Sequence, residues 1–283
     1  MTARPSAPVD PSEAEAREAS LKADRGEPLG LWMGPGAAPE AHGDLRYLDF
    51  EFSSRGDRVP GRLLLPPREE GPFPLVLLQH GLWGSREAAY LDATAGPWVR
   101  AGAAVASIDF PLHGKRAGAK LSGSSGWLAG GAGAGSDPGL RSATVECFRQ
   151  AVMDLQRALD ALGEMPTIDS SRVAYAGFSL GAVVGASFCS VDPRPRAAAL
   201  ALAGGGLLPP EVDPTRHLAR FAPRPLLFVN ANGDETIPRR AALALFDAAR
   251  EPKQMLWFDG SHTELPGEAL KAMWLFLKRH LSM

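Results

Sequence analysis

The sequence has little cysteine, no long apolar run and no excess of charge of either sign. Of its 283 residues only Cys147 and Cys189 are cysteines, and neither forms a Cys-x-x-Cys pair, so a disulfide framework, thiol redox chemistry and a zinc cluster are disfavoured. No apolar stretch approaches the roughly 20 residues that span a bilayer. Lys and Arg number 30 against 32 Asp and Glu, without a basic run that would follow a phosphate backbone. We therefore expect neither a membrane span nor a nucleic-acid partner.

The amino-terminal residues also lack the apolar core of a secretory signal, which favours a cytoplasmic location. Residues 1–44 are rich in Pro, Ala and Glu and contain few large apolar residues, so they cannot support a core of their own. We expect them to form a mobile or loosely docked arm. Within it, Ser12 and Glu15 have the spacing of a capping box that opens a short helix ending near Lys22.

From residue 45 onward the sequence has the pattern of a single α/β domain, 45–283. Leu48, Phe50 and Phe52 alternate with polar residues, and a second apolar segment, 62–65, follows a polar turn, which predicts an antiparallel strand pair with one exposed face. Continuous apolar runs predict strands buried on both faces of a parallel sheet. These runs cover 74–79, 103–108, 172–176, 197–202, 225–229 and 254–258.

Helical patterns lie between these strands. The clearest covers 145–162, where apolar residues spaced three and four apart form one unbroken stripe. The segments 182–189, 241–249 and 265–281 are further predicted helices. Alternation of strand and helix predicts an open α/β fold with a mostly parallel sheet, an antiparallel strand pair at its amino-terminal end and helices on both faces.

Two irregular segments interrupt this alternation. Residues 114–140 are rich in Gly and Ser, and residues 204–224 are rich in Gly and Pro. Both follow the ends of predicted strands, where open α/β sheets bind their ligands. Because long irregular segments in a compact domain usually have a function, both are candidate lid or cap loops.

A Gly-x-Ser-x-Gly pattern occurs at Gly177-Phe178-Ser179-Leu180-Gly181. It lies between the strand predicted at 172–176 and the helix predicted at 182–189. A serine in this position turns sharply, and the two glycines let the helix pack closely on the strand. The turn exposes the hydroxyl at a helix N-terminus, where amide groups stabilise developing negative charge. We therefore predict that Ser179 is a nucleophile.

A serine nucleophile needs a base that accepts its proton. His262 lies in the loop between the last predicted strand and the last predicted helix, which favours it as this base. His80 and His113 precede the serine in the sequence and are the alternatives that a mutational test must separate from His262.

An acid is needed to fix the imidazole tautomer and to stabilise the imidazolium. Asp234 follows the strand predicted at 225–229, one residue after a glycine, in a loop that leads into a helix. Glu235 and Asp259 are the competing carboxylates. We predict that Asp234 has this role.

The developing oxyanion needs backbone N–H donors. One is expected from Leu180, directly after the nucleophile, and the other from Leu82 in the loop after the strand at 74–79. Gly81 permits an unusual backbone angle that directs the Leu82 amide into the site. We expect His80 to brace this loop rather than to transfer protons.

Four features occur in the order used by the α/β-hydrolase superfamily: His80-Gly81, the Gly-x-Ser-x-Gly at Ser179, Asp234 in an Asp-x-x-Ile-Pro context, and Gly-Ser-His262. Over residues 45–283 the chain resembles this superfamily, and its short core resembles the dienelactone-hydrolase and acetyl-esterase-like branches. Unlike dienelactone hydrolases, it has serine rather than cysteine at the nucleophile position. The resemblance implies a Ser-Asp-His triad and a structural histidine in Asp109-Phe-Pro-Leu-His-Gly114.

These residues predict a carboxylesterase-type serine hydrolase that cleaves esters of small to medium acyl chain through an acyl-enzyme, without cofactor or metal. The expected partner is a small-molecule ester. A small peptidase or amidase with the same triad is one alternative, although no acidic cluster that would hold an amino terminus stands out. A non-catalytic homologue that binds a small ligand is the other, although no triad residue is missing.

The predicted pocket walls are Trp83, beside the oxyanion loop, and Trp127, in the flexible segment 114–140. Aromatic walls bury a short acyl chain at ~0.8 kcal/mol per CH₂ until the pocket is full. A pocket under a short lid has no long apolar trough, so we expect a preference for acyl chains of about two to eight carbons.

Overall fold

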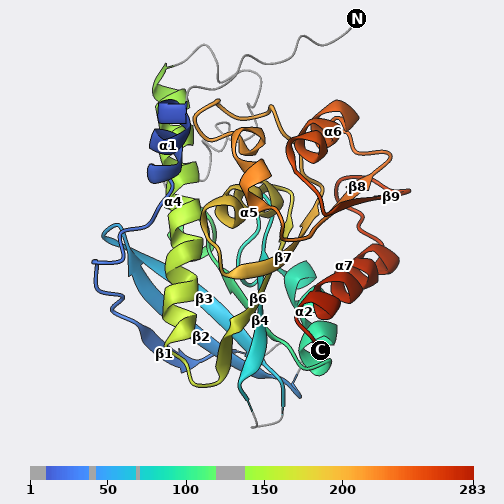
Figure 1. The fold of residues 1–283 in the computed structure, drawn as a ribbon. Helices are drawn as coiled ribbons and strands as arrows, with labels where there is room; N and C mark the ends of the chain where they lie inside the picture. The colour runs from blue at the N-terminus through green and yellow to red at the C-terminus, as the bar shows by residue number, and fades with distance from the viewer. Residues whose placement is uncertain (1–10, 38–42, 68–70, 119–137) are drawn as a thin grey trace, which may run out of the picture.

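The computed structural model describes residues 11–37, 43–67, 71–118 and 138–283, which form one nine-stranded sheet with helices on both faces (Figure 1). The strands are β1 (Trp32–Pro35), β2 (Arg46–Ser54), β3 (Asp57–Leu65), β4 (Phe73–Gln79), β5 (Ala104–Ile108), β6 (Ile168–Phe178), β7 (Pro195–Ala201), β8 (Leu226–Ala231) and β9 (Lys253–Phe258). The α-helices are α1 (Pro11–Ala19), α2 (Ala89–Arg100), α4 (Pro138–Gly163), α5 (Leu180–Val191), α6 (Arg239–Ala248) and α7 (Gly267–His280). Short 3₁₀ turns are η2 (Gly114–Arg116), η4 (Pro214–Arg216) and η5 (Leu218–Phe221).

The sheet has the order β1-β2-β3-β5-β4-β6-β7-β8-β9. The pairings β1–β2, β2–β3 and β3–β5 are antiparallel, and the remaining five are parallel. The predicted fold class is therefore confirmed. The prediction for 254–258 is wrong in one respect: β9 is a strand, but most of its residues are only half-buried because it lies at the edge of the sheet.

Two apolar clusters hold the helices on the sheet. Helices α4, α5 and α6 pack on one face, and α2 and α7 pack on the other, as Figure 1 shows. The apolar stripe predicted at 145–162 is the buried face of α4, from Val145, 7% exposed, to Leu162, 1% exposed. The stripe packs α4 along its length against β2, β6 and α5, so each turn contributes one or two side chains to a continuous core.

The amino-terminal segment is attached more firmly than its composition predicts. Leu21 is completely buried against the α4 side of the core, and the Gln156 amide donates to its carbonyl oxygen at 2.6 Å. Residues 32–35 form β1, which pairs with β2, so the boundary predicted at residue 44 does not separate an arm from the sheet. The sequence does not indicate this docking, because one fully buried leucine and a set of backbone hydrogen bonds leave no apolar segment in the sequence.

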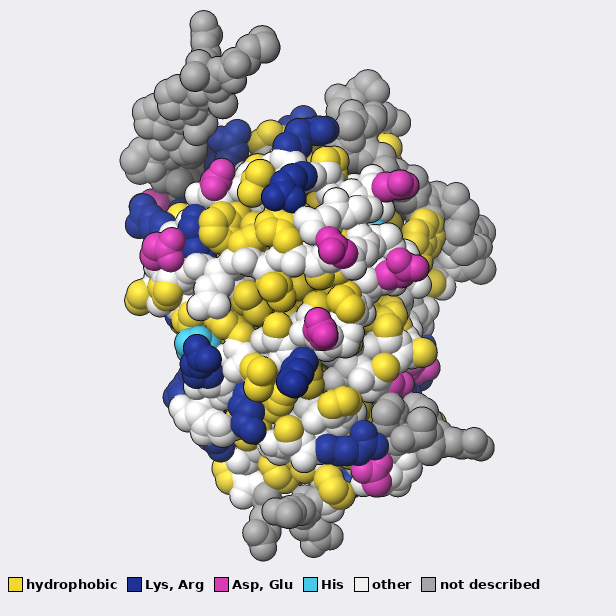
Figure 2. Space-filling model, turned by 90° about the vertical axis from the view of Figure 1, so that its right-hand side faces the viewer, with side chains coloured by type: hydrophobic (Ala, Val, Ile, Leu, Met, Phe, Trp, Pro, Cys, Tyr) yellow, Lys and Arg dark blue, Asp and Glu magenta, His cyan; other side chains and the backbone are white. Residues whose placement is uncertain are grey.

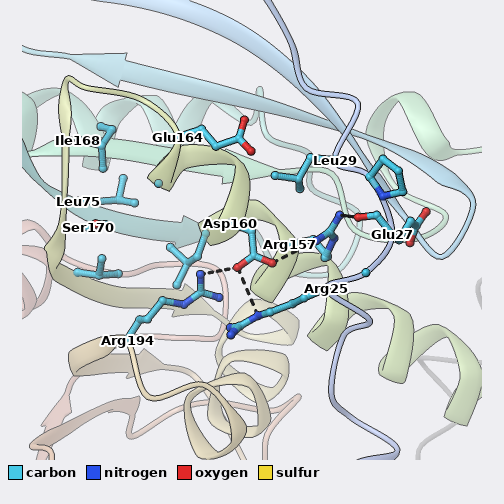
Figure 3. A pocket seen from close by; sticks show the side chains of 15 residues that line it. Arg25, Glu27, Leu29, Leu75, Arg157, Asp160, Glu164, Ile168, Ser170 and Arg194 are labelled. Carbon is cyan, nitrogen blue, oxygen red and sulfur yellow. Dashed lines mark hydrogen bonds and ion pairs between the residues drawn. The ribbon is translucent and has the colours of Figure 1, made fainter.

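A groove of about 630 Å³ lies where residues 25–29 cross α4 and the amino-terminal ends of β4 and β6 (Figure 3). Three guanidinium groups converge there on the Asp160 carboxylate, at 3.6 Å from Arg25, 3.3 Å from Arg157 and 2.6 Å from Arg194. Arg157 also donates to the backbone carbonyl of Glu27 at 2.5 Å. These charged groups are paired with one another, and the ion pairs and the hydrogen bond attach the amino-terminal segment to α4.

The face that carries α6, β9 and α7 shows hydrophobic side chains through its middle, with Lys, Arg, Asp and Glu distributed among and around them (Figure 2). Helices α6 and α7 each have an exposed large apolar residue, Leu243 on α6 and Leu275 on α7. Within the described part of the chain, no helix combines the length and the hydropathy needed to cross a membrane.

A buried histidine lies between η4 and η5. The Nε2 atom of His217 is 2.7 Å from Ser187 Oγ on α5, and its Nδ1 has no hydrogen-bond partner among the described residues. Burial lowers the pKa of His217 to about 4, so the imidazole is neutral in the folded protein at neutral pH. The charges that also act on its pKa are those of Arg220 and Arg17, which lower it, and those of Asp213 and Glu18, which raise it.

We expect this histidine to make the protein acid-sensitive. In the unfolded chain the pKa of a histidine is about 6.5. Between that pH and about 4, the unfolded state therefore binds a proton that the folded state does not bind. The free energy of unfolding should fall by about 1–3 kcal/mol as the pH is lowered through this window. Urea unfolding at pH 7.5 and 4.5 measures the change.

His217→Gln keeps a donor near Ser187 but cannot be protonated, so it should remove one contribution to the acid sensitivity and make the dependence of stability on pH shallower. His280→Gln is the matched control, because His280 is less buried and should contribute less. An unchanged slope in His217→Gln would show that another group causes the acid sensitivity.

Candidate active site

Ser179 occupies a strained turn between β6, which ends at Phe178, and α5, which begins at Leu180. Its backbone angles are φ 50° and ψ −113°, outside the regions that non-glycine residues favour. The turn is held because the Ser179 N–H donates to the carbonyl of Ala201 on β7 at 2.9 Å. The side chain therefore projects from the carboxyl end of the sheet, where the predicted nucleophile needs to be.

The glycines on either side of Ser179 are required by close backbone approach. A Cβ atom at Gly177 would lie 2.5 Å from the carbonyl carbon of Gly181. A Cβ atom at Gly181 would lie 2.7 Å from the carbonyl oxygens of both Gln79 and His80. The first turn of α5 thus packs directly on the end of β4, which brings the serine next to the loop after that strand.

An unbroken chain of hydrogen bonds joins the serine, a histidine and an aspartate. Ser179 Oγ lies 2.8 Å from His262 Nε2, and His262 Nδ1 lies 2.8 Å from Asp234 Oδ2. Asp234 Oδ1 accepts from the backbone N–H groups of Thr236 and Ile237 at 2.8 and 2.7 Å, so its carboxylate is fixed in orientation. The Asp234 side chain is 4% exposed and that of His262 is 17% exposed, which leaves the imidazole accessible to a substrate.

The loops that carry Asp234 and His262 are joined to each other. The Gly233 N–H donates to the Gly260 carbonyl at 3.0 Å, and the Asn232 amide donates to Asp259 Oδ1 at 2.7 Å. Asp259 is thus part of this connection rather than the partner of the imidazole. Glu235, the other competing carboxylate, is exposed.

The loop after β4 is braced by His80. Its Nδ1 donates to the Gly81 carbonyl at 2.8 Å, and its Nε2 accepts from the Phe110 N–H at 3.3 Å. Burial lowers the pKa of His80 to about 4, so it is neutral and able to make both bonds at once. Gly84 N–H donates to the same Gly81 carbonyl at 3.1 Å. This closes a tight turn around Leu82.

Of the two predicted oxyanion donors, Leu82 lies in this turn and Leu180 lies at the start of α5. Leu180 is the first residue of α5, where an N–H group has no partner within the helix. A Cβ atom at Gly81 would lie 3.3 Å from Ser179 Cβ, so the loop that carries Leu82 adjoins the serine. For neither the Leu82 nor the Leu180 amide is an acceptor found among the described residues. Both are therefore available to a ligand.

Sequence reasoning missed the ion pair that ties this loop to the loop after β5. Asp109 is completely buried and accepts from the Arg86 guanidinium at 2.5 Å, the Arg86 N–H at 2.8 Å and the Lys115 N–H at 2.9 Å. His113 donates from Nδ1 to the Pro111 carbonyl at 2.8 Å, and burial lowers its pKa. The Asp-x-x-x-His-Gly pattern was a signal for Asp109, but nothing in the sequence pointed to Arg86 as its partner.

The model of the acetyl xylan esterase (AXE1) family matches residues 44–202, more than half of the chain. The chain belongs to the AXE1 family. It is an α/β-hydrolase and a carboxylesterase of the serine-hydrolase type, as predicted. A comparison with curated proteins gave no match.

Solved structures resemble the whole of this AXE1-family chain. An acetyl xylan esterase from Paenibacillus sp. R4 is 20% identical with a TM-score of 0.71, covering 98% of this chain and 96% of its own. Acetyl xylan esterase 1 from Thermoanaerobacterium sp. JW/SL YS485 is 18% identical with a TM-score of 0.73 and covers 95% of each chain. A cold-adapted esterase from an Arctic intertidal metagenomic library is 23% identical with a TM-score of 0.65, covering 87% of this chain and 99% of its own. At these identities the likeness supports the fold.

The remaining predicted site residues have different outcomes. Trp83 is 65% exposed and has a positive φ of 67°, so its ring lies on the surface beside the oxyanion loop rather than in a closed pocket. Trp127 and most of the candidate lid 114–140 lie outside the described residues. Residues 204–224 form no free cap: Val212, Leu218 and Phe221 are completely buried, because η5 packs against α5.

A substitution at Gly181 should disturb both stability and the site. Gly181→Ala places a methyl group against two backbone carbonyl oxygens of β4 and its loop, which cannot move aside as a side chain would. We expect a loss of about 2 kcal/mol in the free energy of unfolding and a decrease in esterase activity. Gly267→Ala, in the first turn of α7, is the control, since a Cβ atom there meets nothing within 4 Å. Equal behaviour of the two variants would contradict the packing argument.

Proposed function

We propose that Ser179, His262 and Asp234 are the catalytic triad with which this AXE1-family esterase hydrolyses short-chain esters, and that Leu82 and Leu180 supply the oxyanion hole. The observation that supports this most directly is the chain of two 2.8 Å hydrogen bonds from Ser179 Oγ through the imidazole to the Asp234 carboxylate. The half-buried hydroxyl lies at the N-terminus of α5, beside amide groups that have no acceptor among the described residues.

The reaction proceeds in two stages. Ser179 Oγ attacks the acyl carbon while His262 Nε2 accepts its proton, and Asp234 stabilises the resulting imidazolium. The carbonyl oxygen becomes an oxyanion that accepts hydrogen bonds from the amides of Leu82 and Leu180. The tetrahedral intermediate expels the alcohol, which takes the proton from His262. Water, deprotonated by His262, then attacks the acyl-enzyme. The second tetrahedral intermediate expels Ser179 Oγ, which takes the proton back from His262, and the carboxylic acid is released.

The nucleophile is tested by Ser179→Ala. This variant should lower kcat for p-nitrophenyl acetate by roughly 10³-fold or more, because no acyl-enzyme can form. It should also abolish labelling by a fluorophosphonate probe, while thermal unfolding stays close to that of the wild type.

Ser187→Ala is the matched control. Ser187 also lies 2.7 Å from a histidine, His217, but it is completely buried, and among the described residues no carboxylate accepts a hydrogen bond from that imidazole. Its replacement should leave turnover and labelling intact. Labelling that survives in Ser179→Ala would refute the assignment of the nucleophile.

A small apolar hollow beside the nucleophile's helix is the candidate site for the acyl group. An apolar hollow of about 10 Å³ lies beside Leu180. It is lined by Phe110, Pro111, His113, Cys147, Phe148, Ala151, Leu180 and Val184. A space of this size holds of the order of one small group, so we place the acyl methyl of an acetyl ester there.

The alcohol part of the substrate lies toward the surface, where Trp83 is exposed. The family and two of its structural relatives are named for acetyl xylan. An exposed indole ring offers a flat apolar face on which the C–H face of a sugar ring can pack. We therefore propose an acetylated sugar as the substrate class, with Trp83 as the contact for its ring.

Chain-length selectivity tests the hollow. With p-nitrophenyl esters we expect kcat/KM to be highest for acetate and to fall about tenfold or more by hexanoate, since each added CH₂ has no apolar space to enter. Val184→Ala removes two methyl groups from the lining and should move the optimum toward longer chains. Val183→Ala, the neighbouring residue outside the lining, should keep the wild-type profile. An optimum at octanoate in the wild type would contradict the proposal.

A further inference from the structure

Tyr90 contacts both segments that carry the proposed oxyanion donors. It is the second residue of α2, and its hydroxyl oxygen accepts a hydrogen bond from the Gly81 N–H at 2.8 Å. Its ring packs edge-on against Phe178, the residue before the serine, with centroids 5.7 Å apart and planes at 79°. No sequence pattern marked this tyrosine, because the contact depends on how α2 folds back over the loop.

The hydroxyl lies in a notch that glycines leave open. A Cβ atom at Gly84 would lie 2.8 Å from Tyr90 Oη. A Cβ atom at Gly81 would lie 3.8 Å from Tyr90 Oη and 3.3 Å from Ser179 Cβ. Tyr90 Oη and the nucleophile therefore both adjoin Gly81. Burial raises the pKa of Tyr90, so the phenol stays protonated at neutral pH.

Hydrogen bonds at Gly81 fix the direction of the Leu82 amide. The Gly81 carbonyl accepts from His80 and from Gly84, and because the peptide is planar and trans, the Leu82 N–H points the opposite way. The Gly81 N–H, on the other side of the same residue, is held by Tyr90. Gly81 has no side chain to restrict its own rotation, so these bonds take the place of steric restriction.

We propose that Tyr90 is a positioning residue for the oxyanion hole: its hydroxyl holds the Gly81 amide and so keeps the Leu82 N–H aimed at the developing oxyanion. The inference rests on the proposed role of Leu82 as a donor. Tyr90 acts through the backbone rather than on the substrate. Its loss should affect the transition state, where the oxyanion forms, more than the binding of the neutral ester.

The first test is Tyr90→Phe, which keeps the ring against Phe178 and removes one oxygen from a side chain that is 43% exposed. We expect kcat for p-nitrophenyl acetate to fall about 10- to 100-fold, with KM within about twofold of wild type. Tyr47→Phe is the matched control. Tyr47 is a buried tyrosine on β2, opposite Leu64 of β3 and outside the loop after β4, and its replacement should leave kcat unchanged. Thermal unfolding of both variants checks that they remain folded.

The second test uses an aryl trifluoromethyl ketone, whose carbonyl carbon is attacked by Ser179 to give a hemiketal oxyanion. Its Ki should rise in Tyr90→Phe by the same factor by which kcat/KM falls, because both depend on the aimed amide. An unchanged kcat, a loss confined to KM, or a lowered kcat with an unchanged Ki would each overturn the proposal. A wild-type enzyme without esterase activity and without fluorophosphonate labelling would instead refute the proposed function.

Discussion

The sharp turn at Ser179 is the constraint around which the site is arranged. A non-glycine residue at φ 50° is held there by the Ala201 carbonyl and by the close contact of Gly177 with Gly181. The same contact pushes α5 onto the end of β4, which places the loop after β4 beside the serine. The two loops that follow β8 and β9 then bring Asp234 and His262 to the same edge, because parallel strands end together.

Around this turn, buried polar groups restrain loops that have few apolar contacts of their own. Neutral His80 links the β4 loop to Phe110, and Asp109 links Arg86 to Lys115. Each of these groups is buried and bonded, so removing one partner leaves another unsatisfied in a site of low dielectric constant. Such networks fix loop positions closely, which oxyanion stabilisation requires because donors must be aimed before the charge develops.

The rest of the chain supports the site from a distance. Helix α4 covers one face of the sheet, and the segment around Leu21 and β1 is fastened to it through Gln156 and the arginines at Asp160. Helix α5 packs against α4 and also against the segment containing η4 and η5. Helix α5, which begins directly after Ser179, is therefore enclosed on several sides. This packing keeps the strained Ser179 in place at the start of the helix.

The sequence by itself determined the fold class, the positions of the buried strands and of the helices α4 to α7, and the residues now brought together as Ser179, Asp234 and His262. It did so because burial on both sheet faces leaves continuous apolar runs and because a strand–serine–helix turn needs glycines at fixed offsets. Only the tertiary structure decided the rest: the docking of residues 11–37, the exposure of β9 and Trp83, and the contacts of Arg86 and Tyr90. These depend on which segments meet across the sheet, and a single buried side chain or hydrogen bond between distant residues leaves no periodic trace in the sequence.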